Sequence, residues 1–297
     1  MSFQMQPNQA PIANQAIEIM AANQATSLFE KKDIALLLKT NREDWQVPKK
    51  FDVAQFLEQL LTLPNFKKIE VTSALKNIIR YQVGTNEVPL YTLALSLKSK
   101  AFLSHYTAMY LHQLTEQIPK TIYINSELSP KYKPALVLSQ ENIRVAFEKE
   151  QRIAKTKYTY DAYTMYFLET KNIGQRGIIT TTHLNQNIRI TSLERTLIDI
   201  AVRPDYAGGI EEVLKAYKNA AESNVSINKL AALLAEMDFI YPYEQVIGFY
   251  LEHSEAYRPA QIALLAQSNF KYDFYLTYNM KSVDYSEKWK LFYPKGF

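Results

Sequence analysis

A helix start and a helix stop lie close together in residues 191–220, which read TSLERTLIDIAVRPDYAGGIEEVLKAYKNA. Thr191 or Ser192 can cap a helix, and Glu194 stands where its carboxylate can return to the cap amide, as in a capping box. Pro204 disfavours helical backbone at Arg203, so the helix ends there. Between these two signals, apolar residues recur at helical spacing: Leu193, Leu197, Ile200 and Ala201.

A second helix follows after a short turn. Gly208 and Gly209 permit backbone conformations that other residues resist. The apolar positions after this pair again have helical spacing: Ile210, Val213, Leu214 and Tyr217. The stretch therefore predicts a compact helical hairpin.

Charged residues of the first helix form the candidate functional face of this region. Arg195 and Asp199 are four residues apart, as are Asp199 and Arg203, so the three can form a charge ladder. A capping Glu194 and intrahelical ion pairs explain these residues without catalysis, and no nucleophile stands beside them. We therefore expect Glu194, Arg195, Asp199 and Arg203 to form a structural or protein-contacting face.

Two long stretches resemble the AbiEi family of antitoxins from abortive-infection, type IV toxin-antitoxin systems. They are TSLERTLIDIAVRPDYAGGIEEVL, from residue 191, and LSHYTAMYLHQLTEQIPKTIYIN, at residues 103–125. The resemblance implies an N-terminal winged-helix DNA-binding domain and a larger antitoxin domain, encoded beside a nucleotidyltransferase toxin. It also implies a role in phage defence.

Length and composition allow two soluble domains. The chain has 297 residues, of which 47% are hydrophobic and 22% charged, as in ordinary globular proteins. Its net charge of +4 is too mild to demonstrate nucleic-acid binding by itself. We expect an α+β protein with an N-terminal winged helix-turn-helix at residues 1–100 and a larger mixed α/β antitoxin domain at residues 101–297.

Several function classes find no support in the residues. Without cysteine there are no disulfides, thiolate metal sites or cysteine nucleophiles, and the four histidines form no HxxxH or HxH pair. No Walker loop, GxGxxG, GxSxG or HExxH occurs. No apolar run approaches a membrane span, and the polar N-terminus has no signal pattern. We expect a cytoplasmic protein without metal, cofactor, membrane contact or enzymatic activity.

The first hundred residues predict three helices followed by strands. Ser27 with Glu30 is a candidate capping box, and Asp52 can cap a third helix. Strands are expected at residues 67–72, 77–83 and 88–97, with a hairpin tip at residues 84–87. Three helices followed by a β-hairpin is the order of a winged helix-turn-helix domain.

In such a domain the third helix lies in the major groove, and flanking residues contact phosphate. Its expected outer face carries Gln55, Gln59 and Thr62, and glutamine can pair with adenine. Asp52 and Glu58 share that face and repel phosphate. The helix and the expected wing are flanked by the candidate phosphate contacts Lys49, Lys50, Lys67, Lys68, Lys76 and Arg80.

The function we expect is that of an antitoxin and autoregulatory DNA-binding repressor that counteracts a nucleotidyltransferase toxin. Its partner is promoter DNA. Contact with the toxin stays open, because type IV antitoxins are described as acting without a stable toxin complex. A regulator without any toxin is a further possibility.

The alternative from another class is a magnesium-dependent nuclease with a DNA-binding N-terminal module. Asp161, Glu169 and Lys171 are its candidate residues, since Glu169 and Lys171 share one face of an expected strand. Such triplets are frequent by chance.

Overall fold

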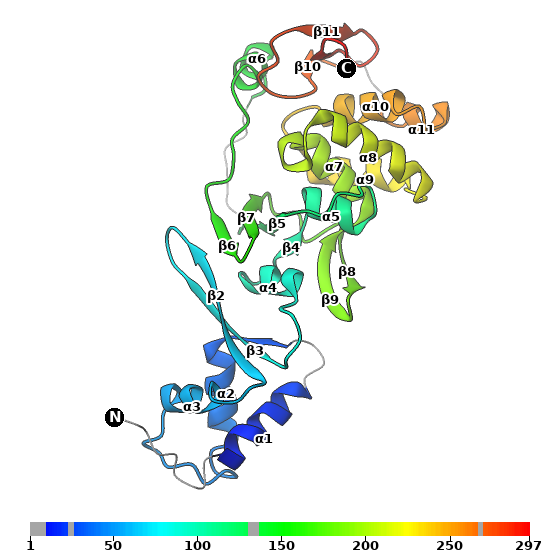
Figure 1. Ribbon diagram of the computed structural model, residues 1–297. Helices are drawn as coiled ribbons and strands as arrows, with labels where there is room; N and C mark the ends of the chain where they lie inside the picture. The colour runs from blue at the N-terminus through cyan, green and yellow to red at the C-terminus, as the bar shows by residue number, and fades with distance from the viewer. Residues whose placement is uncertain (1–9, 23–26, 130–136, 267–269) are drawn as a thin grey trace. The chain divides into compact units, whose positions relative to one another are not determined.

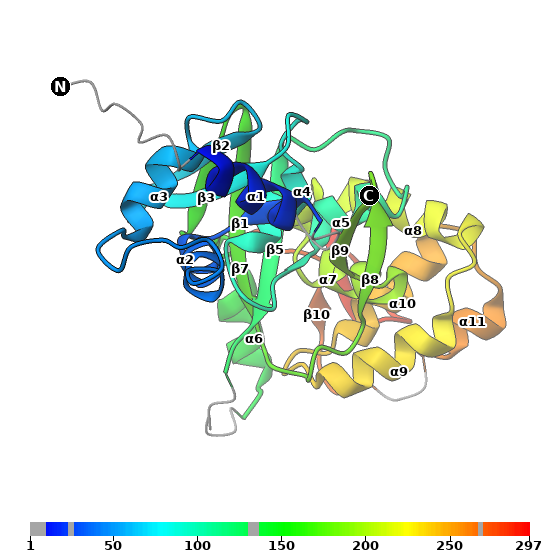
Figure 2. The same ribbon diagram turned by 90° about the horizontal axis from the view of Figure 1, so that it is seen from below.

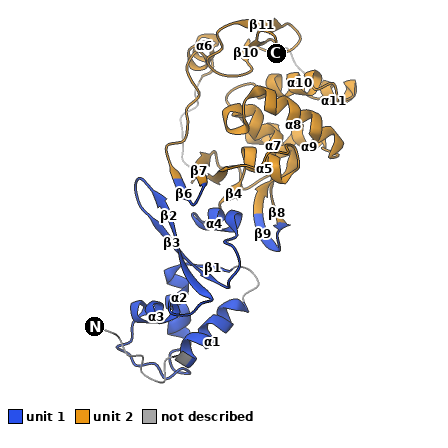
Figure 3. Cartoon of the chain, in the orientation of Figure 1, with its two compact units in different colours: residues 1–99, 158–162, 182–188 blue, residues 100–157, 163–181, 189–297 orange. Residues whose placement is uncertain are grey.

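A computed structural model describes residues 10–22, 27–129, 137–266 and 270–297. The chain has a mixed α and β fold and divides into two compact units (Figure 3). Unit 1 comprises residues 1–99, 158–162 and 182–188, and unit 2 comprises the remaining residues. No helix within the described residues is both long and apolar enough to cross a membrane.

Unit 1 contains helices and strands in an alternating order (Figure 1). Its helices are α1 (Ala10–Ala21), α2 (Lys31–Thr40), α3 (Val53–Leu60) and α4 (Leu90–Ser96). Its strands are β1 (Leu28–Phe29), β2 (Phe66–Ser73), β3 (Ile78–Val83) and nearly all of β6 (Lys157–Tyr160).

The sheet of unit 1 has the strand order β1-β3-β2-β6, with antiparallel neighbours. Phe66, Tyr81 and Val83 alternate along β2 and β3, so their side chains lie on one face of the hairpin. That face packs against the apolar sides of α1, α2 and α3, where Ile34, Phe56 and other side chains are buried (Figure 2). The core of unit 1 lies between these helices and the hairpin.

Three expectations for unit 1 are corrected. Residues 88–97 contain the helix α4 rather than a strand. Pro89 stands at its N-cap, and the consecutive residues Leu93 and Ala94 are both buried, which does not fit the alternation of a strand with one buried face. The hairpin therefore joins β2 to β3 through residues 74–77, not through residues 84–87. In addition, α2 begins after Glu30, whose amide donates to the Asp33 carboxylate at 2.7 Å, and not after Ser27.

Unit 2 has its own sheet region, with the strand order β7-β5-β4-β9-β8. The central pair β5 and β7 is parallel, and Thr121 lies opposite Thr164 at its start. The strands are β4 (Phe102–Leu103), β5 (Thr121–Glu127), β7 (Tyr163–Thr170), β8 (Ile178–His183) and β9 (Gln186–Thr191). The end of the β8–β9 hairpin, residues 182–188, belongs to unit 1.

Helix α7 (Leu193–Val202) is the centre of the helical part of unit 2. The helices α5, α8, α9 and α10 contact it, and Figure 1 shows α7, α8 and α9 side by side. These and the other helices of unit 2 are α5 (His105–Leu111), α6 (Gln140–Phe147), α8 (Ile210–Glu222), α9 (Ile227–Met237), α10 (Tyr243–His253) and α11 (Pro259–Ala263).

The helical hairpin predicted at residues 191–220 is confirmed. Ser192 caps α7 through a bond from the Arg195 amide at 3.3 Å. A 3₁₀ turn (Pro204–Ala207) then ends at Gly208, whose φ of 87° lies in the left-handed region that glycine adopts readily. Helix α8 begins directly after Gly209.

A small C-terminal sheet is attached to α10. It consists of β10 (Phe274–Tyr275), β11 (Val283–Ser286) and β12 (Leu291–Pro294), in the order β10-β12-β11. The Gln245 side chain of α10 donates to the carbonyls of Tyr272, Trp289 and Lys290 at 3.0, 2.7 and 3.0 Å. The fully buried Trp289 ring lies directly against Gly248 of α10.

We expect the substitution Gly248→Ala to destabilise the protein by about 2 kcal/mol or more, because a Cβ there would lie 2.1 Å from the Trp289 ring. In most helices the same change stabilises by about 0.5–1 kcal/mol. Urea unfolding measures whether Gly248→Ala lowers or raises the free energy of unfolding. A second substitution, Trp289→Leu, should reduce the penalty of Gly248→Ala, and equal penalties in both backgrounds would contradict this explanation.

Candidate functional site

Helix α3 begins at Val53 because Asp52 caps its first turn. The Asp52 carboxylate accepts from the amides of Ala54 and Gln55, both at 2.9 Å, and Gln55 Oε1 accepts from the Asp52 amide at 3.1 Å. The predicted capping role of Asp52 is therefore confirmed. The apolar side of the helix is buried through Phe56, Leu57 and Leu60.

The loop before α3 exposes Lys49 and Lys50. Arg42 donates to the carbonyls of Pro48 at 2.6 Å and Phe51 at 2.9 Å, so both ends of this lysine pair are tied to one guanidinium. The Phe51 ring also contacts Phe56 of α3 edge-on, with 6.3 Å between ring centroids. These contacts fix the lysine pair at the N-terminal end of α3.

The outward residues of α3 differ in what they can offer. Gln55 is exposed, and its amide nitrogen has no partner among the described residues. Gln59 is half-buried, and exposed Thr62 donates to the Gln59 carbonyl at 2.7 Å. The exposed carboxylate of Glu58 lies on the same helix. Gln55 is thus the side chain of this set best placed for contact outside the protein.

Two further lysines begin strand β2. Lys67 is half-buried and donates to the Asn86 carbonyl at 3.2 Å. Lys68 is exposed, and its ammonium lies 3.7 Å from the Glu70 carboxylate. This exposed ion pair is weak and screened by salt, so Lys68 can exchange Glu70 for another anion at little cost.

Lys76 lies apart from these lysines. It is exposed in the β2–β3 turn, where the Ser73 hydroxyl accepts from the amides of residues 75 and 76 at 3.3 and 3.0 Å. From Lys68 to Ser73 the strand runs for five residues, which corresponds to about 17 Å. The predicted contacts therefore do not form one continuous patch, and Lys76 belongs to the hairpin tip.

Arg80 does not lie on the exposed surface predicted for it. Arg80 is only 8% exposed. Its guanidinium donates to the Ser96 hydroxyl at 3.0 Å, to the Ser96 carbonyl, and to the Ile79 carbonyl at 2.9 Å. Glu30 lies 3.4 Å away as its ion-pair partner. Because Tyr81 faces the helical core, Arg80 points to the opposite face of the hairpin, where it fastens α4.

In unit 2, the predicted face of α7 is largely interior. Arg195 is fully buried and Asp199 is 7% exposed, and Arg195 Nε donates to Asp199 Oδ1 at 2.9 Å. Arg195 also donates to the carbonyl of Arg176 at 3.0 Å. One further nitrogen of Arg195 and the second oxygen of Asp199 have no partner among the described residues. This pair cannot meet a partner protein without unfolding.

The other two residues of that face have separate roles. Glu194 does not form the predicted capping box; its carboxylate accepts from the Ser192 hydroxyl at 3.2 Å and from the Ser226 amide, at the start of α9, at 3.4 Å. Arg203 is exposed and donates to the Arg152 carbonyl at 3.2 Å, so the ladder stops at Asp199. Only Arg203 remains a fully accessible contact residue.

A buried histidine lies close to this charged pair. His105 is 4% exposed, bonds to the Ser104 hydroxyl at 2.9 Å, and meets the Tyr206 ring edge-on at 5.5 Å. Burial lowers the pKa of His105 from 6.5 to about 4, although Asp199 acts in the opposite direction. Since Ser104 and His105 are both buried, this arrangement is structural.

The three candidate residues of the nuclease alternative do not form a catalytic group. Lys171 pairs with Asp238 at 2.6 Å and also donates to the Asp238 carbonyl at 2.9 Å. Asp161 is an exposed turn residue of unit 1, whereas Glu169 belongs to β7 in unit 2. Among the described residues, no three acidic or histidine side chains are grouped so that they could bind a metal ion.

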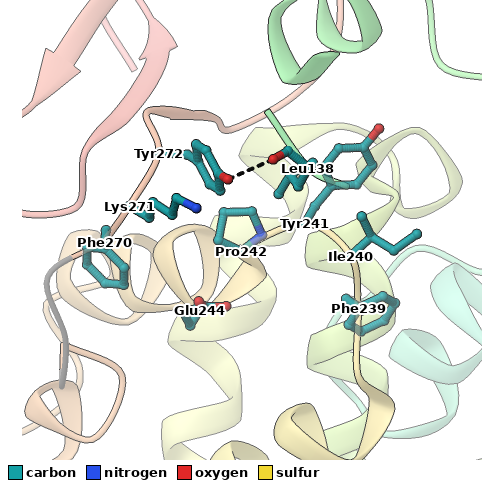
Figure 4. A pocket seen from close by; sticks show the side chains of 9 residues that line it. All are labelled: Leu138, Phe239, Ile240, Tyr241, Pro242, Glu244, Phe270, Lys271 and Tyr272. Atoms are coloured by element: carbon teal, nitrogen blue, oxygen red, sulfur yellow. Dashed lines mark hydrogen bonds between the residues drawn. The ribbon is translucent and has the colours of Figure 1, made fainter. Parts of the chain in front are cut away.

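Sequence patterns did not indicate the two cavities of unit 2 that are described next. The first, of about 300 Å³, is lined by nine residues, of which four are aromatic, Tyr241 and Tyr272 among them (Figure 4). The Tyr272 hydroxyl donates to the Leu138 carbonyl at 2.7 Å. Burial raises the pKa of Glu244 in the same lining. The second cavity, of about 350 Å³, is lined by Glu150, Gln151, Ile153, Asp205, Tyr278 and Asn279.

The fold has a counterpart among solved structures. No protein-family model matches this sequence, and no curated protein matches it significantly. The crystal structure of the RV2827C protein from Mycobacterium tuberculosis is similar, with a TM-score of 0.58 over 98% of this chain and 93% of that chain. At 15% sequence identity the likeness concerns the fold alone.

We expect Asp199→Ala to destabilise unit 2 by roughly 3–5 kcal/mol, because it leaves the buried Arg195 charge without a counterion. The double substitution Arg195→Met with Asp199→Leu should cost much less, since both charges are then absent. Urea unfolding compares these variants with Arg203→Ala, an exposed control expected to cost less than about 1 kcal/mol. An equally mild effect of Asp199→Ala would contradict the importance of the pair.

The pKa of His105 predicts an acid-sensitive stability. The neutral ring is favoured in the folded state, so its contribution is complete above pH 6.5 and is lost as the pH falls to about 4. The shift corresponds to roughly 3 kcal/mol. His105→Asn, which tolerates the positive φ at this position, should remove that part of the decline, whereas His183→Asn should retain it. Parallel pH profiles for wild type and His105→Asn would refute the assignment.

Proposed function

We propose that the protein is an antitoxin and DNA-binding transcriptional repressor of a type IV toxin-antitoxin system, in which it counteracts a nucleotidyltransferase toxin. The observation that carries the DNA-binding half is the element order of unit 1, α1-β1-α2-α3-β2-β3, with the strand order β1-β3-β2. A winged helix-turn-helix domain has this order, with α3 as its recognition helix and the β2–β3 hairpin as its wing.

The chemistry around α3 fits contact with DNA. Lys49 and Lys50 at its N-terminal end can bind phosphate. Lys68, after its C-terminal end, can bind a second stretch of backbone, and Lys67, on the other face of β2, is a separate contact. Gln55, whose amide nitrogen is available, is the candidate for a base edge in the major groove. Lys76 at the hairpin tip is a separate contact.

The acidic residues near α3 bear on how this site works. Asp52 is occupied with capping, and Glu58 and Glu70 lie beside the proposed contacts. They weaken unspecific attraction to phosphate, so base contacts weigh more in the total affinity. A surface of this kind suits a repressor of a particular operator better than a protein that coats DNA.

The antitoxin half of the proposal rests on the resemblance of residues 103–125 and 191–214 to AbiEi antitoxins. Both stretches contribute to the core of unit 2: they include α5, β5 and α7, with several fully buried side chains. If the toxin is bound directly, exposed residues such as Arg203, rather than Arg195 and Asp199, are the contacts to examine. Gene neighbourhood tests whether a toxin exists at all.

We expect alanine substitution of Lys49, Lys50, Lys67 and Lys68 to abolish specific binding to the upstream DNA of the gene, because four phosphate contacts are lost. A mobility-shift titration at two salt concentrations measures this. In wild type, binding should weaken with salt, with a slope of up to about 0.9 per phosphate contact.

The matched control replaces four exposed lysines of unit 2 by alanine: Lys120, Lys218, Lys229 and Lys295. It changes the net charge equally and should retain binding. Both variants should still neutralise the toxin in cells. Equal loss of binding in the control would mean that net charge, and not the position of the lysines, explains the effect. Loss of both neutralisation and DNA binding in the first variant would contradict the assignment of the two activities to separate domains.

A further inference from the structure

The second cavity of unit 2 has a lining of mixed chemistry. Its volume of about 350 Å³ falls at the lower end of small-molecule sites, which range over roughly 300–1,000 Å³. Six residues from three distant stretches line it: Glu150, Gln151, Ile153, Asp205, Tyr278 and Asn279. Two carboxylates, two primary amides and one aromatic ring thus meet at one place.

Gln151 is the unusual member of this lining. It is 7% exposed, yet neither its amide nitrogen nor its amide oxygen has a hydrogen-bond partner among the described residues. Leaving such a group unpaired costs roughly 1–3 kcal/mol. Both atoms are shielded from solvent, so a rotation of the side chain is needed to bring the amide to a group in the cavity. A partner with an adjacent donor and acceptor would satisfy both atoms.

The other polar residues of the lining can add bonds to the same partner. Asp205 is exposed and has no ion-pair or hydrogen-bond partner among the described residues, and the same holds for Glu150. Asn279 accepts from Lys281 Nζ at 3.0 Å, which leaves its amide nitrogen as a donor. The carboxylates require N–H or O–H donors, and the amides accept and donate.

Tyr278 is the aromatic residue of the lining. Phe147 stacks on one face of its ring, with 4.3 Å between centroids and 12° between planes. Only the part of Tyr278 that Phe147 leaves uncovered can contact a ligand. A planar heterocycle can pack there, as bases do on aromatic side chains.

Two arginines lie near Tyr278 of the lining: burial raises the pKa of Tyr278, and the charges of Arg203 and Arg152 act in the opposite direction. Arg152 and Gln151 are neighbours in sequence, and Arg203, which donates to the Arg152 carbonyl at 3.2 Å, lies two residues before Asp205. Lys281 contacts Asn279 as described above. Exposed arginines are suited to phosphate, which they bind through two parallel hydrogen bonds.

We propose that this cavity binds a purine nucleotide. The base would pack on Tyr278, its polar edge would pair with the Gln151 amide and the Asp205 carboxylate, and its phosphate would meet Arg152 and Arg203. A purine has adjacent donors and acceptors of the kind that glutamine pairs with in nucleic acids. A cation such as arginine would satisfy the carboxylates only. The site lies in unit 2 and does not depend on DNA binding by unit 1.

Isothermal titration of the full-length protein tests this with AMP, GMP, CMP, UMP and arginine as probes. We expect AMP or GMP to bind at least tenfold more tightly than CMP and UMP. Asp205→Asn and Gln151→Leu should each weaken purine binding at least tenfold. Gln151→Leu should do so without lowering the melting temperature, because it removes an unpaired buried amide. Arg203→Ala should weaken AMP but not adenosine.

The control Glu116→Gln neutralises an exposed carboxylate outside the lining and should bind as wild type does. Trinucleotides of adenine and cytosine distinguish the source: tighter binding of triadenylate than of AMP assigns the site to a nucleic-acid strand, and the reverse assigns it to a free nucleotide. The proposal is overturned by equal binding of pyrimidines, by a preference for arginine, by no binding at millimolar nucleotide, or by unchanged affinity in Asp205→Asn.

Discussion

The burial of α7 is the constraint on which unit 2 depends. With α5, α8, α9 and α10 packed around it, seven consecutive residues from Arg195 to Ala201 are buried, charged ones included. A buried guanidinium requires counterion and acceptors together, and these come from Asp199 and from the carbonyl of Arg176. The approach is so close that a Cβ at Gly177 would lie 2.9 Å from Arg195 Cβ. The pair thus also determines the path of the chain into β8.

Local sequence signals predicted the beginnings and ends of many elements, because caps and turns depend on near neighbours. The stops at Pro204 and Gly208 and the cap at Asp52 are examples. Burial could not be predicted in the same way. Arg195 and Asp199 have the spacing of a common exposed ion pair, and only the surrounding helices make the pair interior. At residues 88–97 the spacing of the apolar residues fits both a strand and a helix. The helix forms because Leu93 and Ala94 are then both buried.

The proposed DNA-contacting residues likewise differ in how well the sequence predicted their exposure. Lys49 and Lys50 follow a proline in a polar loop, so their exposure was predictable from the sequence. The face on which Arg80 lies depends on the register of β3 against β2, which the misplaced hairpin obscured. The lining of the second cavity joins residues 150, 205 and 278, which only the tertiary fold brings together. No short motif could have indicated it.

If α3 contacts DNA as proposed, the modest charge of the region around it affects recognition as well as affinity. Every lysine–phosphate contact adds affinity for all sequences alike, whereas a base contact adds it for one. In the proposed DNA contact, Glu70, which lies 3.7 Å from Lys68, and the exposed Glu58 of α3 would keep the unspecific contribution small, and physiological salt would reduce it further. The proposal assigns discrimination to Gln55, whose side-chain oxygen accepts from the Asp52 amide and whose side-chain nitrogen is left as a donor. Under this proposal, a base that offers an acceptor, such as N7 of a purine, is the partner that suits the free donor.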